Sequence, residues 1–318
     1  MKPLKASKPY EKSFSQKIFG GGLWLILLVF LLGSGMMFLV IKYSGFDLGI
    51  EDRVGNIQKK LEIISRMRLN LFKAVEAEKS AVIADTDEAS QAFAVQAQKA
   101  GQELEKDLRE LDGLVKKDPS SQEQKLMQEF KGSWQDYRKT DQQLLDYAVK
   151  NTNIKAAKLS FEQGSQSMKR FEDALNELGA GKSASRDEIQ ITRLVGEALV
   201  AAVKIHYLHA PHIAAANDDQ MDKLEGEIKK NQEKIKKSLD QLRSLVPAKK
   251  QGALQKARMA DEELMKVTEK VIELSRQNTN IKSFELSLGR KRKITAQCDE
   301  ILLGLQETVR GRSFKVTR

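Results

Sequence analysis

Apolar residues recur at intervals of three and four along most of the chain, which is the pattern of helices with one buried face. One such stripe lies between residues 154 and 178, a second between 221 and 246, and a third between 294 and 309. The first stripe places Phe161 and Gly164 at positions expected to be buried. Runs of Val, Ile and Thr that alternate with polar residues are absent from the sequence, so no sheet is predicted.

Short polar segments separate the stripes and predict where helices end. They lie near residues 85–87, 117–120, 151–153, 179–185, 217–219, 247 and 278–280. These breaks predict eight helices of about 27–35 residues, or roughly 40–50 Å each. Long amphipathic helices need partners, and antiparallel bundles are their usual arrangement.

The breaks repeat along the chain, which indicates an internal duplication. Residues 151–155 (Asn-Thr-Asn-Ile-Lys) return at 278–282, an offset of 127, and three leucines spaced by three residues return at an offset of 131. Self-similarity at this scale implies two copies of one unit. The sequence therefore predicts an all-α fold with two antiparallel four-helix bundles in tandem, residues 45–180 and 186–311, side by side or stacked.

One run near the N-terminus is apolar on every side. Residues 18–41 carry no charge over 24 positions. About 20 apolar residues span a membrane, whereas the apolar part of a signal peptide has only about 7–15, so we expect an uncleaved transmembrane helix. Five lysines precede it, and this bias predicts a cytoplasmic N-terminal tail (1–17) and an extracytoplasmic remainder at a bacterial inner membrane.

The net charge of +10 lies at the ends of the chain. Residues 1–17 contribute +4 and residues 290–318, which include a basic tail over 312–318, contribute +5. A nucleic-acid-binding protein would carry a basic stripe with interleaved aromatic residues, and the middle of this chain has none, so no nucleic-acid partner is expected. The terminal charge suits a neighbouring lipid bilayer instead.

Several segments resemble a known family. Residues 78–88 are similar to the end of the first helix in the extracytoplasmic four-helix ligand-binding domain of methyl-accepting chemotaxis receptors, and 278–288 are similar to the junction between its third and fourth helices. The resemblance covers residues 18–310 as a tandem pair. It implies a sensor that forms a homodimer through its first helices. Those receptors also have a second membrane span and a cytoplasmic signalling hairpin, which this sequence does not contain.

Arg68 is the main candidate for ligand contact. It lies on the apolar stripe of the first predicted helix, which continues to Glu78. A guanidinium that faces a core needs a partner. The resemblance implies that first-helix arginines hold a ligand carboxylate, and Arg66 is a second candidate. The alternatives are an ion pair with an acidic side chain on another helix, or a stripe that turns Arg68 toward solvent.

All three histidines lie within one segment, 206–212. His206 and His209 are one helical turn apart, so they can share a metal, line a pocket or respond to pH. The commonest fate of such residues is plain packing or solvation. We name both as candidate ligand-binding residues and predict no metal site, because no Cys or acidic residue lies within a turn.

No pattern in the sequence points to catalysis. Gly179 to Ser183 lacks the first glycine and the preceding strand of a phosphate-binding loop, so it is interpreted as a linker. Asn231 and Cys298 lie on apolar stripes, where a register-fixing amide and a small apolar side chain are the usual roles. We expect no enzyme activity and no cofactor.

Two functions fit these features. The first is an anchored extracytoplasmic sensor that binds a small acidic solute or a periplasmic protein, and that signals through a membrane partner or through a continuation of the chain. The second is a structural or scaffolding envelope protein without a small-molecule ligand.

Overall fold

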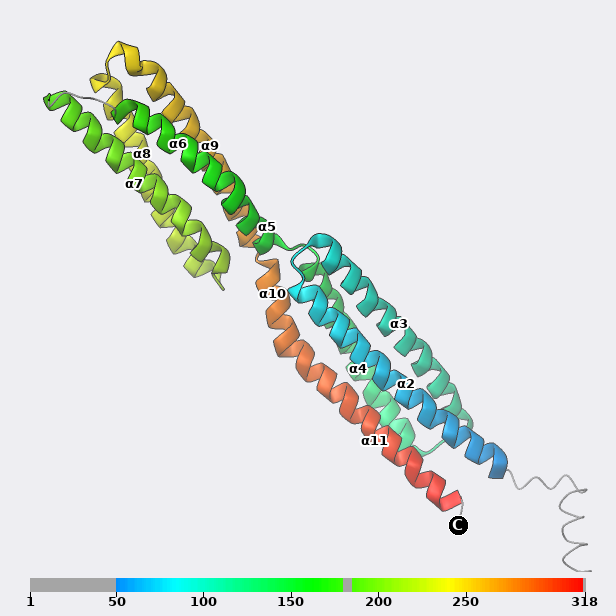
Figure 1. The fold of residues 1–318 in the computed structure, drawn as a ribbon. Helices are drawn as coiled ribbons and strands as arrows, with labels where there is room; N and C mark the ends of the chain where they lie inside the picture. Colours follow the sequence, from blue (N-terminus) through cyan, green and yellow to red (C-terminus); the bar gives the residue numbers. More distant parts are fainter. Residues whose placement is uncertain (1–49, 180–184, 317–318) are drawn as a thin grey trace, which may run out of the picture. The chain divides into compact units, whose positions relative to one another are not determined.

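The computed structural model describes residues 50–179 and 185–316 (Figure 1). Every regular element in these two ranges is helical, which confirms the all-α class. The α-helices are α2 (Ile50–Ile83), α3 (Asp87–Lys117), α4 (Ser121–Ala148), α5 (Thr152–Leu159), α6 (Ser165–Gly179), α7 (Arg186–Ala214), α8 (Asp218–Leu245), α9 (Gln251–Gln277), α10 (Thr279–Leu286) and α11 (Arg292–Val316). A short 3₁₀-helix, η2 (Ala248–Lys250), precedes α9.

The helices form two groups. Bundle I consists of α2, α3, α4 and the last helix α10–α11, as shown by packing of α10 on α4 and by ion pairs from α2 to each of the other three. Bundle II consists of α5–α6, α7, α8 and α9. Apolar side chains of α6–α9 form one core, and Ala156 of α5 packs in a smaller cluster with Val267 and Val271 of α9. In Figure 1, the orange-red α10–α11 runs beside the blue-green helices of bundle I.

This grouping differs from the expected boundaries of 45–180 and 186–311. The segment 152–179 packs in bundle II, and the equivalent segment 279–316 packs in bundle I. The apolar stripe of a helix shows which face is buried but not which neighbour buries it. Because the two segments begin with the same Thr-Asn-Ile-Lys motif and continue with similar apolar stripes, the sequence is equally compatible with either exchange.

The two chain crossings between the bundles pair with each other. The backbone N–H of Thr152 donates to Thr279 Oγ1 at 3.2 Å, and the N–H of Thr279 donates to Thr152 Oγ1 at 3.2 Å. The same reciprocal bonds join the N–H groups and side-chain oxygens of Asn153 and Asn280, at 3.1 and 3.2 Å. Each helix therefore caps the first turn of the other, where the N–H groups have no partner within their own helix.

Two π-helical turns occupy equivalent places. They are η1 (Ser160–Gly164), between α5 and α6, and η3 (Ser287–Lys291), between α10 and α11. A π turn contains more than four residues, so it changes the face on which later residues lie. The expectation that Phe161 is buried is wrong for this reason: its side chain is 79% exposed, and Ser160 is buried instead.

The chain divides into two compact units. The larger is Lys60–Gly311, and the smaller is Met1–Lys59 with Arg312–Arg318. The described parts of the smaller unit are the first turns of α2 and the end of α11. The sites discussed below all lie in the larger unit.

The expected fold needs one correction. Within residues 50–179 and 185–316, no helix is both long enough and apolar enough to cross a membrane, because charged residues line the outer face of each helix. The transmembrane helix expected over 18–41 and the tail over 1–17 lie outside the described residues. The described residues therefore form two all-helical bundles, and none of their helices is a membrane-spanning one.

Candidate functional site

A pocket of about 390 Å³ lies in bundle I, between α2 and the helix formed by α10, η3 and α11. It has an apolar wall, a polar floor and several charged groups. Its lining residues are Arg68, Leu71, Phe72, Val75, Glu78, Lys79, Ser287, Leu288, Lys291, Arg292, Thr295, Ala296 and Asp299. The volume suits a small organic molecule.

Two large apolar side chains of this pocket are open to solvent. Phe72 on α2 is 68% exposed, and Leu288 in η3 is 50% exposed. An exposed phenylalanine keeps apolar surface in water, which is unfavourable unless a partner covers it. The pocket can therefore accept the apolar part of a ligand.

Glu78 forms part of the polar floor. Its side chain is 1% exposed, and Oε1 has no hydrogen-bond partner. Burial raises the pKa of this carboxyl, against the opposing effects of a hydrogen bond with Ser287 and the charge of Lys291. A buried unpaired oxygen is costly, so Glu78 is suited to exchange a hydrogen bond with a ligand.

Lys291 lies on the same floor and is 1% exposed. Its ammonium pairs with Asp141 on α4 and lies 3.6 Å from the centroid of the Tyr137 ring. Burial lowers the pKa of Lys291, whereas Asp141 and Glu78 act in the opposite direction. Burial also raises the pKa of Tyr137 well above its usual value.

The π turn η3 positions these groups. It begins at Ser287 and ends at Lys291, and both side chains are buried. Single π turns inside α-helices are frequent at functional sites.

Arg68 lies at the edge of the pocket and is about one third exposed, at 34%. Its Nε donates to Asp299 Oδ1 at 2.8 Å, and a second nitrogen donates to Gln306 Oε1 at 3.4 Å. An interhelical ion pair, which was one of the alternatives, is therefore present. Whether Arg68 also contacts a ligand stays a prediction.

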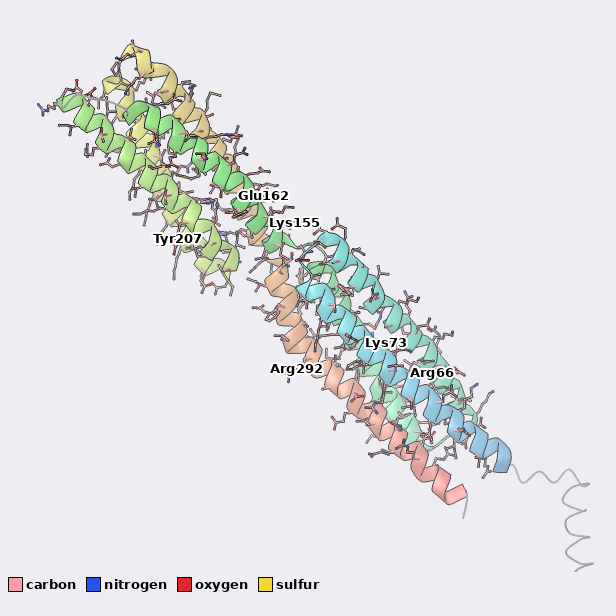
Figure 2. All side chains as sticks on the ribbon, viewed as in Figure 1. Arg66, Lys73, Lys155, Glu162, Tyr207 and Arg292 are labelled. Carbon is pink, nitrogen blue, oxygen red and sulfur yellow. The ribbon has the colours of Figure 1, made fainter. Side chains whose placement is uncertain are left out.

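Arg66 lies elsewhere. Positions two residues apart on a helix point about 200° apart, so Arg66 faces α3, as Figure 2 shows, and does not line this pocket. It donates to Asp107 at 2.8 Å, Glu110 at 3.0 Å and Glu62 at 2.8 Å. The hydrogen bond to Asp107 is the main cause that raises the pKa of Arg66. The predicted pair of arginines is thus not brought together.

His209 and His206 belong to bundle II. His209 is fully buried, with Nδ1 2.9 Å from Ser160 Oγ and Nε2 3.1 Å from Thr268 Oγ1. The hydroxyl of Thr268 donates to Leu264 O at 2.8 Å, so it must accept from Nε2–H of a neutral His209. Burial lowers the pKa of His209 to about 4.

His206 packs against His209 with ring centroids 5.4 Å apart, at a nearly perpendicular angle. Its Nδ1 is buried without a hydrogen-bond partner, and burial lowers its pKa. Neither histidine is near Arg68, and no group of His, Cys, Asp and Glu in the described ranges is placed to hold a metal ion.

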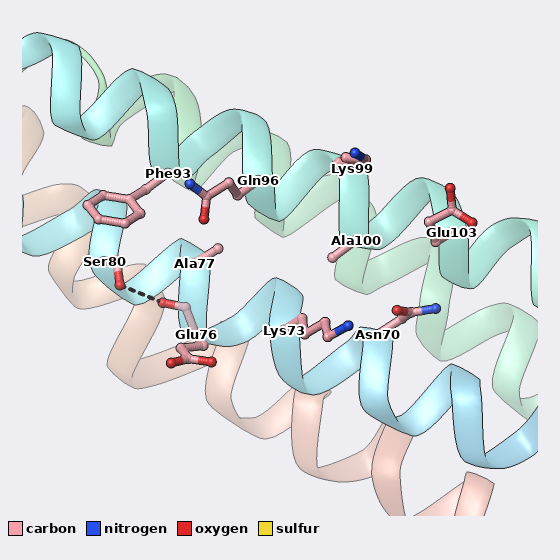
Figure 3. A pocket seen from close by; sticks show the side chains of 10 residues that line it. All are labelled: Asn70, Lys73, Glu76, Ala77, Ser80, Phe93, Gln96, Lys99, Ala100 and Glu103. Atoms are coloured by element: carbon pink, nitrogen blue, oxygen red, sulfur yellow. Dashed lines mark hydrogen bonds between the residues drawn. The ribbon is translucent and has the colours of Figure 1, made fainter.

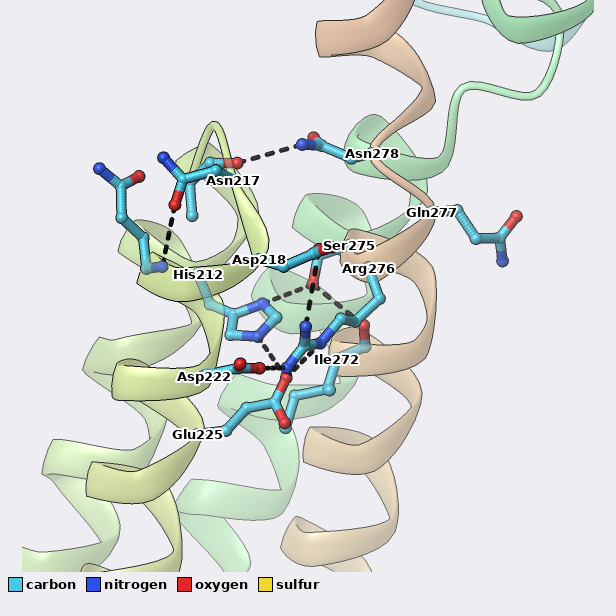
Figure 4. Close-up of polar contacts among 12 residues, drawn as sticks. His212, Asn217, Asp218, Asp222, Glu225, Ile272, Ser275, Arg276, Gln277 and Asn278 are labelled. Carbon is cyan, nitrogen blue, oxygen red and sulfur yellow. Dashed lines mark hydrogen bonds and ion pairs between the residues drawn. The ribbon is translucent and has the colours of Figure 1, made fainter.

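The third histidine has a stronger set of partners than the sequence suggested. His212 is buried, and its Nε2–H donates to Glu225 Oε1 at 3.0 Å. Glu225 also accepts from Nε of Arg276 at 2.6 Å, as Figure 4 shows. Although burial opposes it, these two donors lower the pKa of Glu225. The network ties α7, α8 and α9 together at the end of bundle II next to Asn278.

The buried polar groups of the two bundles occupy matching positions. Ser160 and Thr268 contact His209 in bundle II. Ser287 contacts Glu78 in bundle I, and Lys291 joins Asp141 to it. Ser160 corresponds to Ser287, and Asp141 to Thr268, at an offset of 127, and Glu78 corresponds to His209 at an offset of 131. Equivalent positions thus hold a neutral network in bundle II and a charged one in bundle I.

A second depression of bundle I, of about 410 Å³, lies between α2 and α3 (Figure 3). Lys73 and Lys99 alternate there with Glu76 and Glu103, and Phe93 closes one end. Unlike the α2–α11 pocket, it contains no buried polar atom without a partner among the described residues. We therefore take the α2–α11 pocket as the candidate site.

Sequence reasoning placed Glu78 on the core-facing stripe but missed Lys291 and Asp141. Asp141 had a signal, because it continues the α4 stripe of Phe130, Trp134 and Tyr137. No sequence pattern indicated that Lys291 is buried, because η3 changes the face on which the residues of this helix lie.

Comparisons with known proteins identify a family of helical sensory modules. The model of a family described as "Four helix bundle sensory module for signal transduction" matches residues 15–190. No curated protein matches the chain. Among solved structures, the sensor domain of the histidine kinase TorS from V. parahaemolyticus matches with 14% identity and a TM-score of 0.49, over 80% of this chain and 97% of that one. Because the family match spans more than half of the sequence, this chain belongs to the family of four-helix-bundle sensory modules for signal transduction.

Proposed function

We propose that the chain senses a small anionic ligand with an apolar body, and that this ligand binds in the α2–α11 pocket of bundle I. The observation that carries the proposal is a buried polar group in a pocket with an exposed apolar wall: Glu78 Oε1 has no hydrogen-bond partner, and Phe72 and Leu288 line the same pocket. Pockets that combine apolar walls with a few convergent polar groups are typical ligand sites.

The charges of the pocket favour an anion. Arg68, Lys79, Lys291 and Arg292 line it, against Glu78 and Asp299. The carboxyl of Glu78, whose pKa is raised, can donate a hydrogen bond when protonated. A carboxylate ligand would satisfy Arg68 bidentately and place its apolar part on Phe72.

The signal would arise from competition for Arg68. In the unliganded pocket this guanidinium joins α2 to Asp299 on α11. A ligand carboxylate that takes over Arg68 releases Asp299, so α2 and α11 are free to shift against each other. Shifts of one or two ångströms between packed helices are an established form of signal transmission.

A thermal-shift screen of small carboxylates tests the proposal. A ligand at a hundredfold excess over its Kd should raise the melting temperature by about 5 °C or more. Arg68→Ala should abolish this rise. Arg66→Ala is the matched control, since it removes the same side chain from the same helix outside the pocket, and it should retain the rise. The sensor proposal fails if a broad library of carboxylates shifts neither the wild type nor the control.

A protein-binding role is the second candidate. Val200, Val203 and Tyr207 form an exposed apolar stripe on α7, and Leu69 and Phe72 form one on α2. Such stripes suit contact with a second copy of the chain or with another protein. Sedimentation over a range of concentrations, with Val203→Lys as the variant, distinguishes a homodimer from a monomer.

We also infer an extracytoplasmic location. The only cysteine, Cys298, is fully buried, and burial raises the pKa of its thiol to about 12. The described domain therefore has no reactive thiol that an oxidising compartment would mispair. A periplasm-dependent reporter fused after Arg318 should be active, whereas a cytoplasm-dependent one should not.

A further inference from the structure

A groove of about 730 Å³ runs along bundle II between α7 and α8, away from the candidate site. It is rich in basic side chains. Its lining residues are Arg193, Gly196, Glu197, Val200, Ala201, Lys204, Asn231, Lys234, Lys237, Ser238 and Gln241. Four cations thus face a single carboxylate.

Only one of these cations is neutralised nearby. Arg193 donates to Glu197 at 2.9 Å, one turn along α7. Lys204, Lys234 and Lys237 are exposed and make no salt bridge to any residue that the structure describes. Three like charges on one groove repel one another, and an anion from solution would relieve this repulsion.

The equivalent groove of bundle I shows how the chain neutralises the same face elsewhere. The register between the two helix pairs is set by the caps of the second helices: Thr86 accepts from Ala89 N before α3, and Asn217 accepts from Gln220 N before α8, at an offset of 131. Residues at this offset can therefore be compared directly.

In bundle I, Arg66 is held by Asp107 at 2.8 Å and by Glu110 at 3.0 Å. The position of Arg66 corresponds to Glu197 in bundle II. The positions that correspond to these two acids in bundle II are Ser238 and Gln241. Both carboxylates are thus replaced by neutral side chains. Glu103 of bundle I also corresponds to a cation, Lys234, so α8 lacks three acids that α3 carries at the equivalent positions.

Asn231 adds a second, independent sign of a ligand. Its side chain is 8% exposed and lines the groove. Nδ2 donates to Glu227 O at 2.8 Å, but Oδ1 is buried and has no hydrogen-bond partner. Its equivalent in bundle I is Ala100. A buried amide oxygen without a hydrogen-bond donor is unfavourable. A ligand of this groove would therefore have to supply a donor for Asn231 Oδ1 as well as negative charge for the lysines.

We propose that the α7–α8 groove binds a phosphoryl polyanion. Lysine ammoniums act as point charges and bind phosphate oxygens, and a phosphoryl group places up to about two negative charges and three acceptor oxygens on one centre, which a single carboxylate does not. The one arginine here is occupied by Glu197. A protonated phosphate oxygen or a hydroxyl of a phosphate ester supplies the donor that Asn231 Oδ1 lacks.

Titration calorimetry of the full chain with pyrophosphate tests this assignment. Lys234→Gln with Lys237→Gln should weaken binding about tenfold or more, because two charged contacts are lost. Lys229→Gln with Lys230→Gln is the matched control. It makes the same charge change on exposed residues of α8 outside the groove, and it should alter the Kd less than about twofold.

A second substitution returns to α8 one of the acids that α3 carries. Gln241→Glu, at an exposed position of the groove, should also weaken pyrophosphate binding, while the melting temperature stays within a few degrees of the wild type. The proposal is overturned if pyrophosphate does not bind, if both lysine pairs weaken it equally, or if citrate binds as tightly as pyrophosphate.

The phosphoryl group can belong to a soluble ester or to a lipid headgroup. Cosedimentation with phosphatidylcholine vesicles, with and without phosphatidic acid, separates these sources. Binding to phosphatidic acid that the Lys234→Gln and Lys237→Gln pair removes supports a lipid source. Pyrophosphate binding without vesicle binding supports a soluble one, and the absence of both contradicts the proposal.

Discussion

At the scale of single residues, the most costly feature of the chain is buried charge. Lys291 and Asp141 are almost completely enclosed, and Lys60 is enclosed with Glu123 at 2.8 Å. A buried ion pair adds little net stability, but losing one partner leaves an uncompensated charge. A buried ion pair therefore marks a place where the fold bears the desolvation cost of two charges without gaining stability from them.

Lys291→Met tests the pair in the floor of the pocket. The substitution leaves Asp141 without its cation, so the free energy of unfolding should fall by about 3–5 kcal/mol. Adding Asp141→Leu should recover most of this loss. Lys79→Met, an exposed lysine of the same pocket, should change stability by less than about 1 kcal/mol. Urea denaturation followed by Trp134 fluorescence measures all four; a loss in Lys291→Met as small as that in Lys79→Met would refute the argument.

His209 should make bundle II sensitive to acid. Its pKa is about 4 in the folded chain and 6.5 as a free side chain. The unfolded chain therefore binds the proton first, and the contribution of neutral His209 is complete above pH 6.5 and is lost as the pH falls toward 4. The loss should reach about 3 kcal/mol at most.

His209→Gln isolates this effect, because glutamine keeps a donor and an acceptor but does not titrate. The difference in unfolding free energy between wild type and variant should shrink steadily between pH 7 and pH 4.5. Burial raises the pKa of Asp261 to about 6, so its contribution to stability changes with pH in the opposite direction. Because Asp261 is present in both proteins, this contribution cancels in the difference between them. A constant difference across this range would contradict the assignment.

At the scale of elements, the sequence predicted the helices and their breaks but not the π turns. The stripe through Phe161 was drawn with a constant helical period, and η1 breaks that period at Ser160. A π turn depends on how two packed helices share their buried polar groups, here Ser160 with His209. Such a turn has no local sequence pattern, so Phe161 was placed on the wrong face, whereas Gly164 is buried as expected.

The paired helix starts at the bundle junction should be energetically coupled. Thr152→Val and Thr279→Val each leave one backbone N–H without an acceptor, and each should cost about 1–2 kcal/mol. Because the hydroxyls also contact each other at 3.1 Å, the double variant should deviate from the sum by at least about 0.5 kcal/mol. Thr192→Val, an exposed threonine bonded within its own helix, is the control; strict additivity of the junction pair would argue against reciprocal capping.

At the scale of the whole molecule, the sequence could not determine which helices share a bundle. Segments 152–179 and 279–316 present the same faces, and only their contacts with α7–α9 and α4 distinguish them. The charged residues said more about long-range contacts than the apolar stripes did. Arg68 was expected to need a partner, and its partner, Asp299, is 231 residues away in the sequence. No periodicity within one helix encodes a contact over that separation.

Lys60–Gly311 forms one compact unit that contains both bundles, so they should unfold together. In a Trp24→Phe background, Trp134 fluorescence reports bundle I alone, whereas far-ultraviolet circular dichroism reports both. The two melting curves should coincide. Replacing Asn153 and Asn280 with alanine should separate them, with at least two transitions by circular dichroism; coincident curves in that variant would show that the junction does not couple the bundles.

The exchange of helices also sets the order in which the chain can fold during its synthesis. Bundle II is built from one continuous stretch, 152–277, and can close as soon as that stretch leaves the ribosome. The first three helices of bundle I are made before bundle II, but their fourth helix, α11, emerges only after it. For that interval, α2, α3 and α4 expose an apolar face with no partner in place. Nascent chains in this state are the ones that aggregate or recruit chaperones, so translation speed through the second bundle should govern the yield of folded protein.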